Sequence, residues 1–330
     1  MKFLIRSFLL SQFLFSFSLA KGQSSLIDSL FHTDSIRHLV KVLASDSLQG
    51  RYPGTTESLN AADFIADEFE KAGLSSVAGY DGFFQEVRIG WFNVIGAIKG
   101  RSKPGQLIIF SAHYDHIGSI STNPYPGFGG QAKAEKGDTI YNGANDNASG
   151  VSAVISLAKY FKALNNNERT LIFVAFTGEE LGLLGSKYFV AGCEPDSIIA
   201  VINFDMIGRG QFSNSHPFVT GYEKSDLIDI LNRNYRSLPA KNSEREFFKR
   251  DKNTNEFLFN RSDNFSFAVK GVPAHSIMVT PSNDEYYHNL NDETRTLDFN
   301  LMKKVIRAIA IGTTGLITGK DTPSRIKEAD

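Results

Sequence analysis

The strongest constraint on the fold is an alternation, from residue 107 onward, between short apolar runs and segments of helical period. Continuous apolar runs are typical of strands buried on both faces. A chain that alternates them with helices is expected to form a largely parallel sheet covered on both sides. The expected strands are residues 107–112, 171–176, 198–204 and 275–279, and the expected helices are residues 151–164, 181–191, 225–235 and 301–317.

The N-terminal half adds two helices and two strands to this pattern. Helices are expected at residues 34–44 and 56–73, and strand-like runs follow at 84–89 and 93–98. Gly73 supplies a C-terminal stop for the second helix, and Ser149 is a candidate N-cap for the helix at 151–164. Because no repeat or linker interrupts the chain, we expect one domain at residues 23–320 and a flexible, charged tail at 321–330.

The first 22 residues have the form of a secretory signal peptide. Lys2 and Arg6 precede an apolar run at 8–19, and small and polar residues follow it. No Cys follows the run, so a lipoprotein anchor is not expected. No later stretch approaches ~18 uninterrupted apolar residues, so no membrane anchor is expected in the mature chain. The only cysteine, Cys193, allows no internal disulfide. We therefore expect a soluble protein exported to the periplasm or the extracellular space.

Charge excludes one class of partner. The chain has 35 Lys and Arg against 36 Asp and Glu, a formal net charge of −1. Nucleic-acid binding requires clustered positive charge that neutralises phosphates. We therefore expect no nucleic-acid partner, and no obligate protein partner is evident.

Titratable side chains follow every predicted strand of the parallel part, at the sheet edge where such folds bind ligands. Taken singly, each has a simpler interpretation as a loop histidine, a turn or cap residue, or a surface residue. Their coincidence on one edge favours a shared site. The residues are His113, Asp115, Asp146, Glu179, Glu180, Asp205, His288 and Asp292.

Histidine mixed with carboxylate, and no cysteine, is a donor set that favours zinc. Five potential ligands are too many for one tetrahedral ion but suit two ions that share a bridging carboxylate. Asp115, two residues after His113, can accept the other ring N–H of that histidine and orient it. Asp292 can do the same for His288.

The adjacent carboxylates Glu179 and Glu180 admit two interpretations. They are typical of a solvated helix N-terminus, where acidic residues are common. Next to two metal ions, one of them can ligate while the other takes a proton from water, and the metal charge offsets their repulsion. Among the remaining histidines only His116 is close enough to the site to be left open.

From about Leu48 to Asp292 the chain resembles peptidase family M28, the co-catalytic dizinc aminopeptidases. The motifs that carry the resemblance occur in the family's order: LQGRYPGT, SAHYDHIG, GANDNASG, FTGEELGLLGS, INFDMIG and YYHNLNDE. The resemblance implies an α/β fold with a mixed, mainly parallel β-sheet sandwiched between helices. It therefore agrees with the pattern of strands and helices.

Carried over position by position, the resemblance implies two zinc ions per chain. Glu179 would be the general base, and Asp115 the outer partner of His113. The implied ligands are His113 and Asp205 for one ion, Glu180 and His288 for the other, and Asp146 as the bridge.

Two positions depart from the family pattern. Asn145 stands where a second Asp often precedes the bridging one, which implies tuning of the site rather than its loss. Asn264 occupies a place where many members carry His, so the group that assists the substrate carbonyl stays open.

The resemblance implies a metallo-exopeptidase that acts on peptides with a free N-terminus. Three alternatives stay open. Glutaminyl cyclases use one zinc on the same scaffold but depart from the NASG pattern at 147–150 that this chain retains. A dizinc carboxypeptidase or dipeptidase would need a basic clamp for the substrate carboxylate. A non-catalytic binding module should have lost ligands, and none of the five is missing.

Overall fold

The computed structural model describes residues 30–122, 137–210, 216–237, 246–251, 257–280 and 284–329. The predicted signal peptide at 1–22 lies outside these residues. Among them, no helix has the length and apolar character that crossing a membrane requires.

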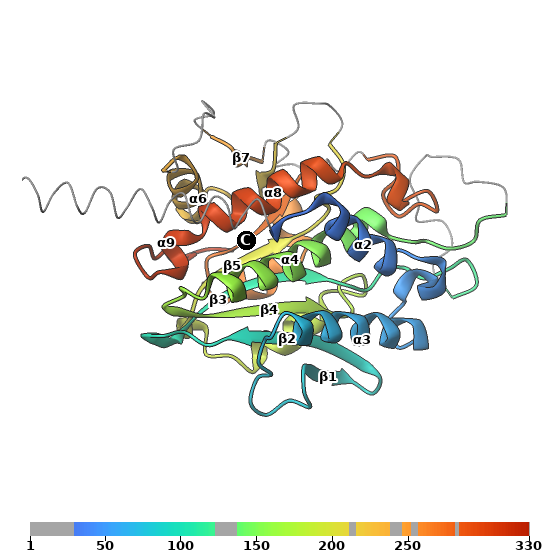
Figure 1. The fold of residues 1–330 in the computed structure, drawn as a ribbon, viewed down its shortest axis with the longest axis horizontal. Coiled ribbons are helices and arrows are strands. Elements are labelled where there is room, and N and C mark those ends of the chain that lie inside the picture. The colour runs from blue at the N-terminus through green and yellow to red at the C-terminus, as the bar shows by residue number, and fades with distance from the viewer. Residues whose placement is uncertain are drawn as a thin grey trace, which may run out of the picture.

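An eight-stranded sheet crosses the molecule in the order β1-β2-β4-β3-β5-β8-β6-β7 (Figure 1). The four central strands β4, β3, β5 and β8 are parallel, whereas β2 pairs antiparallel with both β1 and β4, and β6 pairs antiparallel with β8 but parallel with β7. The strands are β1 (Phe84–Arg88), β2 (Trp91–Ile98), β3 (Lys103–His113), β4 (Arg169–Phe176), β5 (Ile198–Phe204), β6 (Phe218–Val219), β7 (Lys249–Arg250) and β8 (Ala274–Met278).

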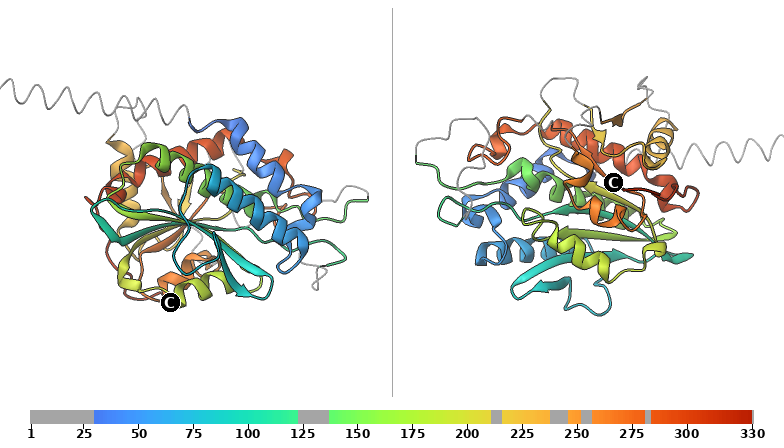
Figure 2. Two further views of the ribbon diagram at one scale, coloured as in Figure 1. Left: turned by 60° about the horizontal axis from the view of Figure 1, so that its bottom comes forward. Right: turned by 180° about the vertical axis from the view of Figure 1, so that it is seen from behind.

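Helices cover both faces of the sheet (Figure 2). Alternate residues of β4 enter opposite cores: Phe173 lies in the core under the larger helices, and Val174 lies in the core under the smaller ones. The predicted fold class, a mixed, mainly parallel sheet between helices, is therefore confirmed. The helices are α2 (Thr33–Leu43), α3 (Thr56–Lys71), α4 (Gly150–Leu164), α5 (Leu184–Ala191), α6 (Leu227–Arg236), α7 (Asn264–Ala268), α8 (Phe299–Gly312) and α9 (Thr314–Ile317).

Local chemistry explains where elements differ from the sequence expectation. The helix expected from residue 181 begins at Leu184, because Gly182 and Leu183 donate backbone N–H groups to the Glu179 carbonyl in a turn. Ser149 stands at the N-cap position of α4, as predicted, but its side chain makes no capping hydrogen bond. Its hydroxyl instead donates to the carbonyl of Asn145. The short strands β6 and β7 were not predicted, because two residues carry no periodic signal.

The C-terminal segment packs against the domain, in contrast to the flexible tail expected from its charge. The side chain of Ile326 is 4% exposed, and its backbone N–H donates to the Gly271 carbonyl. The Arg325 guanidinium donates to the Ile198 carbonyl at the start of β5. These contacts anchor residues 321–326 at the edge of the sheet opposite to the carboxyl ends.

Buried His275 on β8 makes the fold sensitive to acid. Its neutral ring donates from Nδ1 to the Thr220 carbonyl at 2.8 Å and accepts at Nε2 from the Ser225 hydroxyl at 2.6 Å. Burial lowers the pKa of His275 to about 4. Its ordinary pKa is about 6.5, so below that pH the unfolded chain binds a proton that the folded chain excludes.

We therefore expect the free energy of unfolding to fall by about 2 kcal/mol when the pH is lowered from 8 to 5, because the unfolded chain then protonates His275. Urea unfolding of the wild type and of His275→Gln at both pH values checks this. The variant, which has no imidazole at this position, should lose less stability on acidification by about that amount. Equal losses in the two proteins would contradict the expectation.

Candidate metal centre and active site

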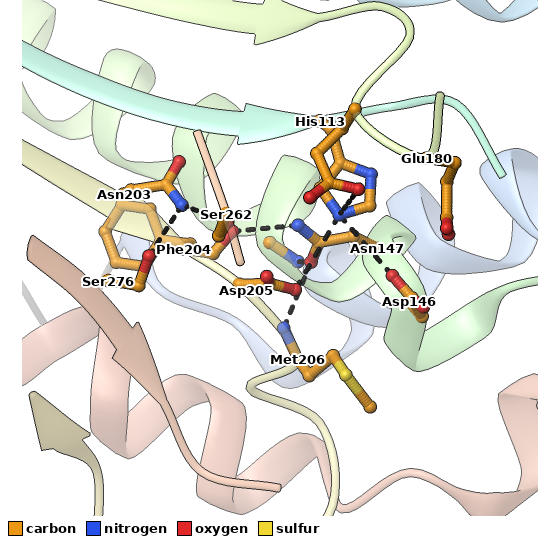
Figure 3. Close-up of polar contacts among 12 residues, drawn as sticks. His113, Asp146, Asn147, Glu180, Asn203, Phe204, Asp205, Met206, Ser262 and Ser276 are labelled. Carbon is orange, nitrogen blue, oxygen red and sulfur yellow. Dashed lines mark hydrogen bonds and ion pairs between the residues drawn. The ribbon is translucent and has the colours of Figure 1, made fainter. Parts of the chain in front are cut away.

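The predicted site residues converge at the carboxyl edge of the central strands. His113 ends β3, Asp205 follows β5, and Glu180 lies in the turn after β4. Asp146 lies in the irregular helical turn Ala144–Ser149 that leads into α4. Figure 3 shows His113, Asp146, Glu180 and Asp205 approaching one another from these separate segments. The sheet register that aligns β3, β4 and β5 places them together.

The ligand atoms form two groups that share one aspartate. In the first, His113 Nε2 lies 3.4 Å from Asp146 Oδ1 and 3.7 Å from Asp205 Oδ1. In the second, His288 Nε2 lies 3.0 Å from Glu180 Oε2 and 3.2 Å from Asp146 Oδ2. Each oxygen of Asp146 therefore faces a different group, as a bridging carboxylate requires. All five predicted ligands are brought together, in the predicted grouping.

The spacing of these atoms fits cations. Ligand atoms at ~2.0–2.1 Å from a tetrahedral zinc are about 3.3 Å from one another, close to the separations in both groups. His288 Nε2 is buried and, despite its two near carboxylate oxygens, makes no hydrogen bond within the described part of the chain. Imidazoles and carboxylates without thiolates are the donors that zinc accepts in catalytic sites. The residues present fit a zinc centre.

The charges of the site also favour bound cations. Burial, reinforced by the Glu180, Asp263 and Asp205 carboxylates, raises the pKa of Glu179 well above its usual range. Burial opposes charge on His288, yet the Glu180 and Asp146 carboxylates raise its pKa to about 11. A cluster that draws protons this strongly has an excess of buried negative charge, and bound cations relieve such an excess.

His116 is a site residue to which the sequence assigned no role. Its Nδ1 lies 2.9 Å from Glu180 Oε1 and 3.8 Å from Asp146 Oδ2, so it joins the second ligand group. Burial alone would raise the pKa of Glu180, but the His288 and His116 rings lower it well below its usual range. The sequence feature that could have indicated a role for His116 is its position three residues after His113, on the same loop.

Asp115 lies beside the His113 ring, as predicted, but its backbone carbonyl is nearer to that ring than its carboxylate is. The ring Nδ1 of His113 lies 3.2 Å from the Asp115 backbone carbonyl, whereas the carboxylate is 3.9 Å away. The carboxylate instead accepts the backbone N–H groups of Glu179 and Glu180 at 3.1 and 3.3 Å. Burial raises its pKa to about 7. Asp115 thus fixes the turn that presents both glutamates.

Within the described residues, the Asp292 carboxylate is bonded to the backbone at Asp146 and not to His288, which corrects the prediction. Its carboxylate accepts the backbone N–H groups of Asn145 and Asp146, at 2.9 and 3.0 Å, and a 2.6 Å bond from Arg209. The turn at residues 289–292 directs this carboxylate toward the loop before α4. Arg209 was not predicted, because nothing in its sequence neighbourhood marks it as the partner of a residue 83 positions later.

The two departures from the family pattern have structural roles. The Asn145 amide donates to the Thr280 hydroxyl, and its oxygen accepts the Gly208 N–H. Asn264 is fully buried, donates to the Phe259 carbonyl, and accepts from the Ser276 hydroxyl. Figure 3 shows the adjoining part of this buried polar chain, where Asn203 joins Ser262 and Ser276. Asn264 therefore faces the interior.

A pocket opens beside the ligand groups. Glu179 lines it, and so do Met206, Leu258 and Met278, which form a small apolar cluster. Four of the five predicted ligands also line it: His113, Asp146, Glu180 and Asp205. Arg261 and Tyr287 also line the pocket, and the Arg261 guanidinium donates to the Tyr287 hydroxyl at 3.3 Å. The pocket lining thus combines predicted metal ligands, an apolar cluster and the basic side chain of Arg261.

A mixed sheet with histidine–carboxylate groups at its carboxyl edge is an arrangement that suits a metal-dependent enzyme. Comparison with protein families narrows this class. Residues 93–311, well over half of the chain, match Peptidase family M28. The chain belongs to this family, and the family and the metallopeptidase class predicted from the sequence are confirmed.

Individual relatives agree with this assignment. The chain is 27% identical over 299 residues to a probable leucine aminopeptidase of Trichophyton verrucosum, a match that covers 85% of this chain and 73% of the relative. The LapA aminopeptidase of Legionella pneumophila superposes with a TM-score of 0.68 at 20% identity, over 90% of this chain and 75% of that one. Porphyromonas gingivalis glutaminyl cyclase superposes with a TM-score of 0.63 at 17% identity, over 87% and 99%. The two superpositions show a shared fold.

Proposed function

We propose that this protein is a zinc-dependent aminopeptidase that removes N-terminal residues from peptides and binds two zinc ions. His113 and Asp205 would hold one ion, and Glu180 and His288 the other. The observation that carries the proposal is the placement of Asp146, whose two oxygens face the two ligand groups. The name of the Trichophyton relative supports the aminopeptidase activity.

Bound zinc would supply a Lewis acid for the scissile carbonyl and a water of lowered pKa. Glu179 then acts as general base: it accepts a proton from the attacking water and donates it to the leaving amine. Its Oε2 lies 3.9 Å from His113 Nε2, within the pocket. Because burial raises the pKa of Glu179, its carboxylate holds a proton more readily than an exposed one. The Asp115 carboxylate keeps its backbone in place.

The pocket also suggests the substrate's first residue. Buried carboxylates attract the cationic α-amino group of a peptide. The side chain of the same residue can then pack against the apolar cluster of Met206, Leu258 and Met278. Methionine side chains are flexible and tolerate differently shaped apolar partners. We propose a preference for apolar N-terminal residues such as leucine and methionine.

Arg261 favours a second candidate. A carboxypeptidase or dipeptidase needs a basic group for the free carboxylate of its substrate, and Arg261 is a basic side chain in the pocket. Guanidinium groups bind carboxylates in a bidentate manner. The substrate would then be oriented by its C-terminus, and a blocked N-terminus would be tolerated.

We further propose that the protein is exported. This rests on the sequence pattern of residues 1–22, with Lys2 and Arg6 before an apolar run. N-terminal sequencing of protein recovered from the periplasmic and culture fractions of expressing cells tests it. A mature chain that begins near residue 23 supports export, and an uncleaved cytoplasmic chain contradicts it.

One purified sample of the mature chain tests the enzymatic proposal. Zinc per chain is measured by mass spectrometry, and hydrolysis is followed before and after chelation. The substrates are aminoacyl p-nitroanilides, their N-acetyl counterparts, N-acetyl dipeptides with a free carboxylate, and a peptide with N-terminal glutamine.

About two zinc ions per chain, with chelator-sensitive cleavage of free-amino substrates only and the fastest cleavage for leucine or methionine, is the expected result. Cleavage of N-acetyl dipeptides would support the role of Arg261 as a carboxylate clamp. One zinc and cyclisation of the glutamine peptide would support a cyclase. A metal-free protein without activity would overturn the proposed function.

A further inference from the structure

Arg51, in the loop motif LQGRYPGT, is fully buried and has no role in the proposed chemistry. Its guanidinium donates four hydrogen bonds, all to backbone carbonyls. Nε donates to Tyr114 at 2.6 Å, Nη1 to Leu43 at 2.5 Å and to Asn142 at 2.6 Å, and Nη2 to Gly143 at 3.0 Å. One side chain therefore joins three segments that are far apart in the sequence.

Two of these segments carry the metal centre. Tyr114 lies between the ligand His113 and Asp115, whose carboxylate fixes the turn of the two glutamates. Gly143 precedes Asp146 by three residues, and its carbonyl also accepts the Ala148 N–H within the same turn. The Arg51 guanidinium thus holds both backbone segments at a fixed separation. The third segment, the end of α2, anchors it to the helical layer.

The backbone of the Arg51 loop is also locked against the same region. Gly50 has a φ of +72°, and a Cβ at this position would lie 2.1 Å from the Gly118 carbonyl oxygen. The Gly118 N–H in turn donates to the Gly50 carbonyl. Because this loop approaches the neighbouring backbone so closely, the Arg51 side chain enters from a fixed position.

The positive charge of Arg51 offers a competing explanation for its burial. Burial lowers the pKa of Arg51 to about 10, opposed by the charges of Asp146, Asp292, Asp115 and Glu180, so the guanidinium stays positive at neutral pH. A buried positive charge could serve mainly to offset these carboxylates. It would then repel incoming cations, and its removal would strengthen zinc binding. The four carbonyl acceptors distinguish the explanations, because they match the planar fork of a guanidinium and not a point charge.

We propose that Arg51 is a positioning residue of the metal centre, which sets the bridging Asp146 and the ligand His113 at the separation that zinc binding requires. The inference rests on the proposed zinc centre. Outer partners that orient ligands typically change metal affinity by about 10- to 100-fold.

Zinc affinity of the full mature chain tests this inference. Wild type, Arg51→Lys and Arg51→Gln are titrated with zinc against a competing chromophoric chelator, and the melting temperatures of the zinc-free and zinc-loaded forms are recorded. Both variants are expected to bind zinc about 10- to 100-fold more weakly. Lysine should fail because its ammonium cannot reach three segments at once.

Arg169 provides a matched control at the opposite edge of the sheet. It is also buried and donates to two backbone carbonyls, those of Leu316 and Asp321, but it lies at the start of β4, away from the carboxyl edge that carries the ligands. Arg169→Lys should lower the melting temperatures of both forms equally and leave zinc affinity unchanged. A structural role of Arg51 alone would make its variants behave in the same way, and that result would overturn the proposal.

The remaining outcomes are also decisive. Wild-type affinity in Arg51→Lys, with tighter binding in Arg51→Gln, would show a charge effect and overturn the proposal. If neither variant folds, Asn142→Ala replaces them, because the Asn142 amide ties the same segment to Ala44 and Asp46. Weaker zinc binding in that variant supports the proposal, and unchanged binding overturns it. A wild type that binds no zinc would contradict the proposed function itself.

Discussion

A Glu179→Gln variant is expected to keep its zinc and to lose about 10²- to 10⁴-fold in kcat, the range that general bases typically contribute. Glutamine preserves the size of the side chain but cannot accept a proton from water. The turn itself should survive, because the Asp115 carboxylate binds the backbone N–H groups of residues 179 and 180, not their side chains. The loss should therefore appear in kcat, with KM nearly unchanged.

The neighbouring glutamate supplies the matched control. Glu180→Gln makes the same chemical change one residue later, where Oε2 lies 3.0 Å from His288 Nε2 in the second ligand group. This variant should lose zinc from that group. Zinc per chain and steady-state kinetics are measured on both variants and the wild type.

Comparison of the two variants decides whether Glu179 is a general base or a metal ligand. Glu179 also lies near His113 and Glu180 in a third arrangement that could hold an ion. If Glu179→Gln loses zinc as Glu180→Gln does, then Glu179 is a ligand and not a base. Near wild-type turnover in a zinc-loaded Glu179→Gln would also refute the base assignment.

The parts of this site that the sequence predicts are those that follow from local pattern and strand order. His113 and Asp205 come directly after an apolar run, Glu180 lies in the turn that follows one, and parallel strands bring such positions to one edge. Asp146 precedes a helix that follows the first of these strands. For these residues, predicting the strand was sufficient to predict the place of the side chain.

The outer partners could not be predicted in the same way, because their contacts are set by tertiary packing. Arg51 binds carbonyls up to 92 residues away, at acceptors that every residue type carries. Asp292 was expected near His288 from their spacing, but an intervening turn directs it to Asn145 and Asp146. His116 was visible in the sequence, yet only the fold shows that its ring faces Glu180.

An Asp146→Asn variant is expected to lose both zinc ions and at least about 10³-fold in kcat/KM. Without Asp146 the first group keeps only His113 and Asp205. The second keeps Glu180 and His288, and the His116 ring there is already paired with Glu180 Oε1 at 2.9 Å. Catalytic zinc sites use three protein ligands. An asparagine keeps the shape and the backbone N–H that donates to Asp292, but its single oxygen cannot serve both groups. Zinc per chain and kcat/KM are measured with zinc supplied in moderate excess.

Asp205→Asn is the control, because it removes a ligand of one group, whereas Asp146→Asn removes a ligand shared by both. Asp205 faces only the first group, through a 3.7 Å approach to His113 Nε2, so the second group keeps Glu180, His288 and Asp146. This variant should retain about one zinc per chain. Loss of one ion in both variants would contradict the bridging role, because Asp146 would then serve a single group.

Stability distinguishes loss of a ligand from loss of the fold. A ligand that binds only the folded state raises the melting temperature by an amount that increases with the logarithm of its concentration divided by its dissociation constant. Zinc should therefore stabilise the wild type most and Asp205→Asn less, and it should not stabilise Asp146→Asn. The three zinc-free proteins should share the same circular dichroism spectrum. A graded response on one common fold can arise only if Asp146 contributes to both groups and Asp205 to one.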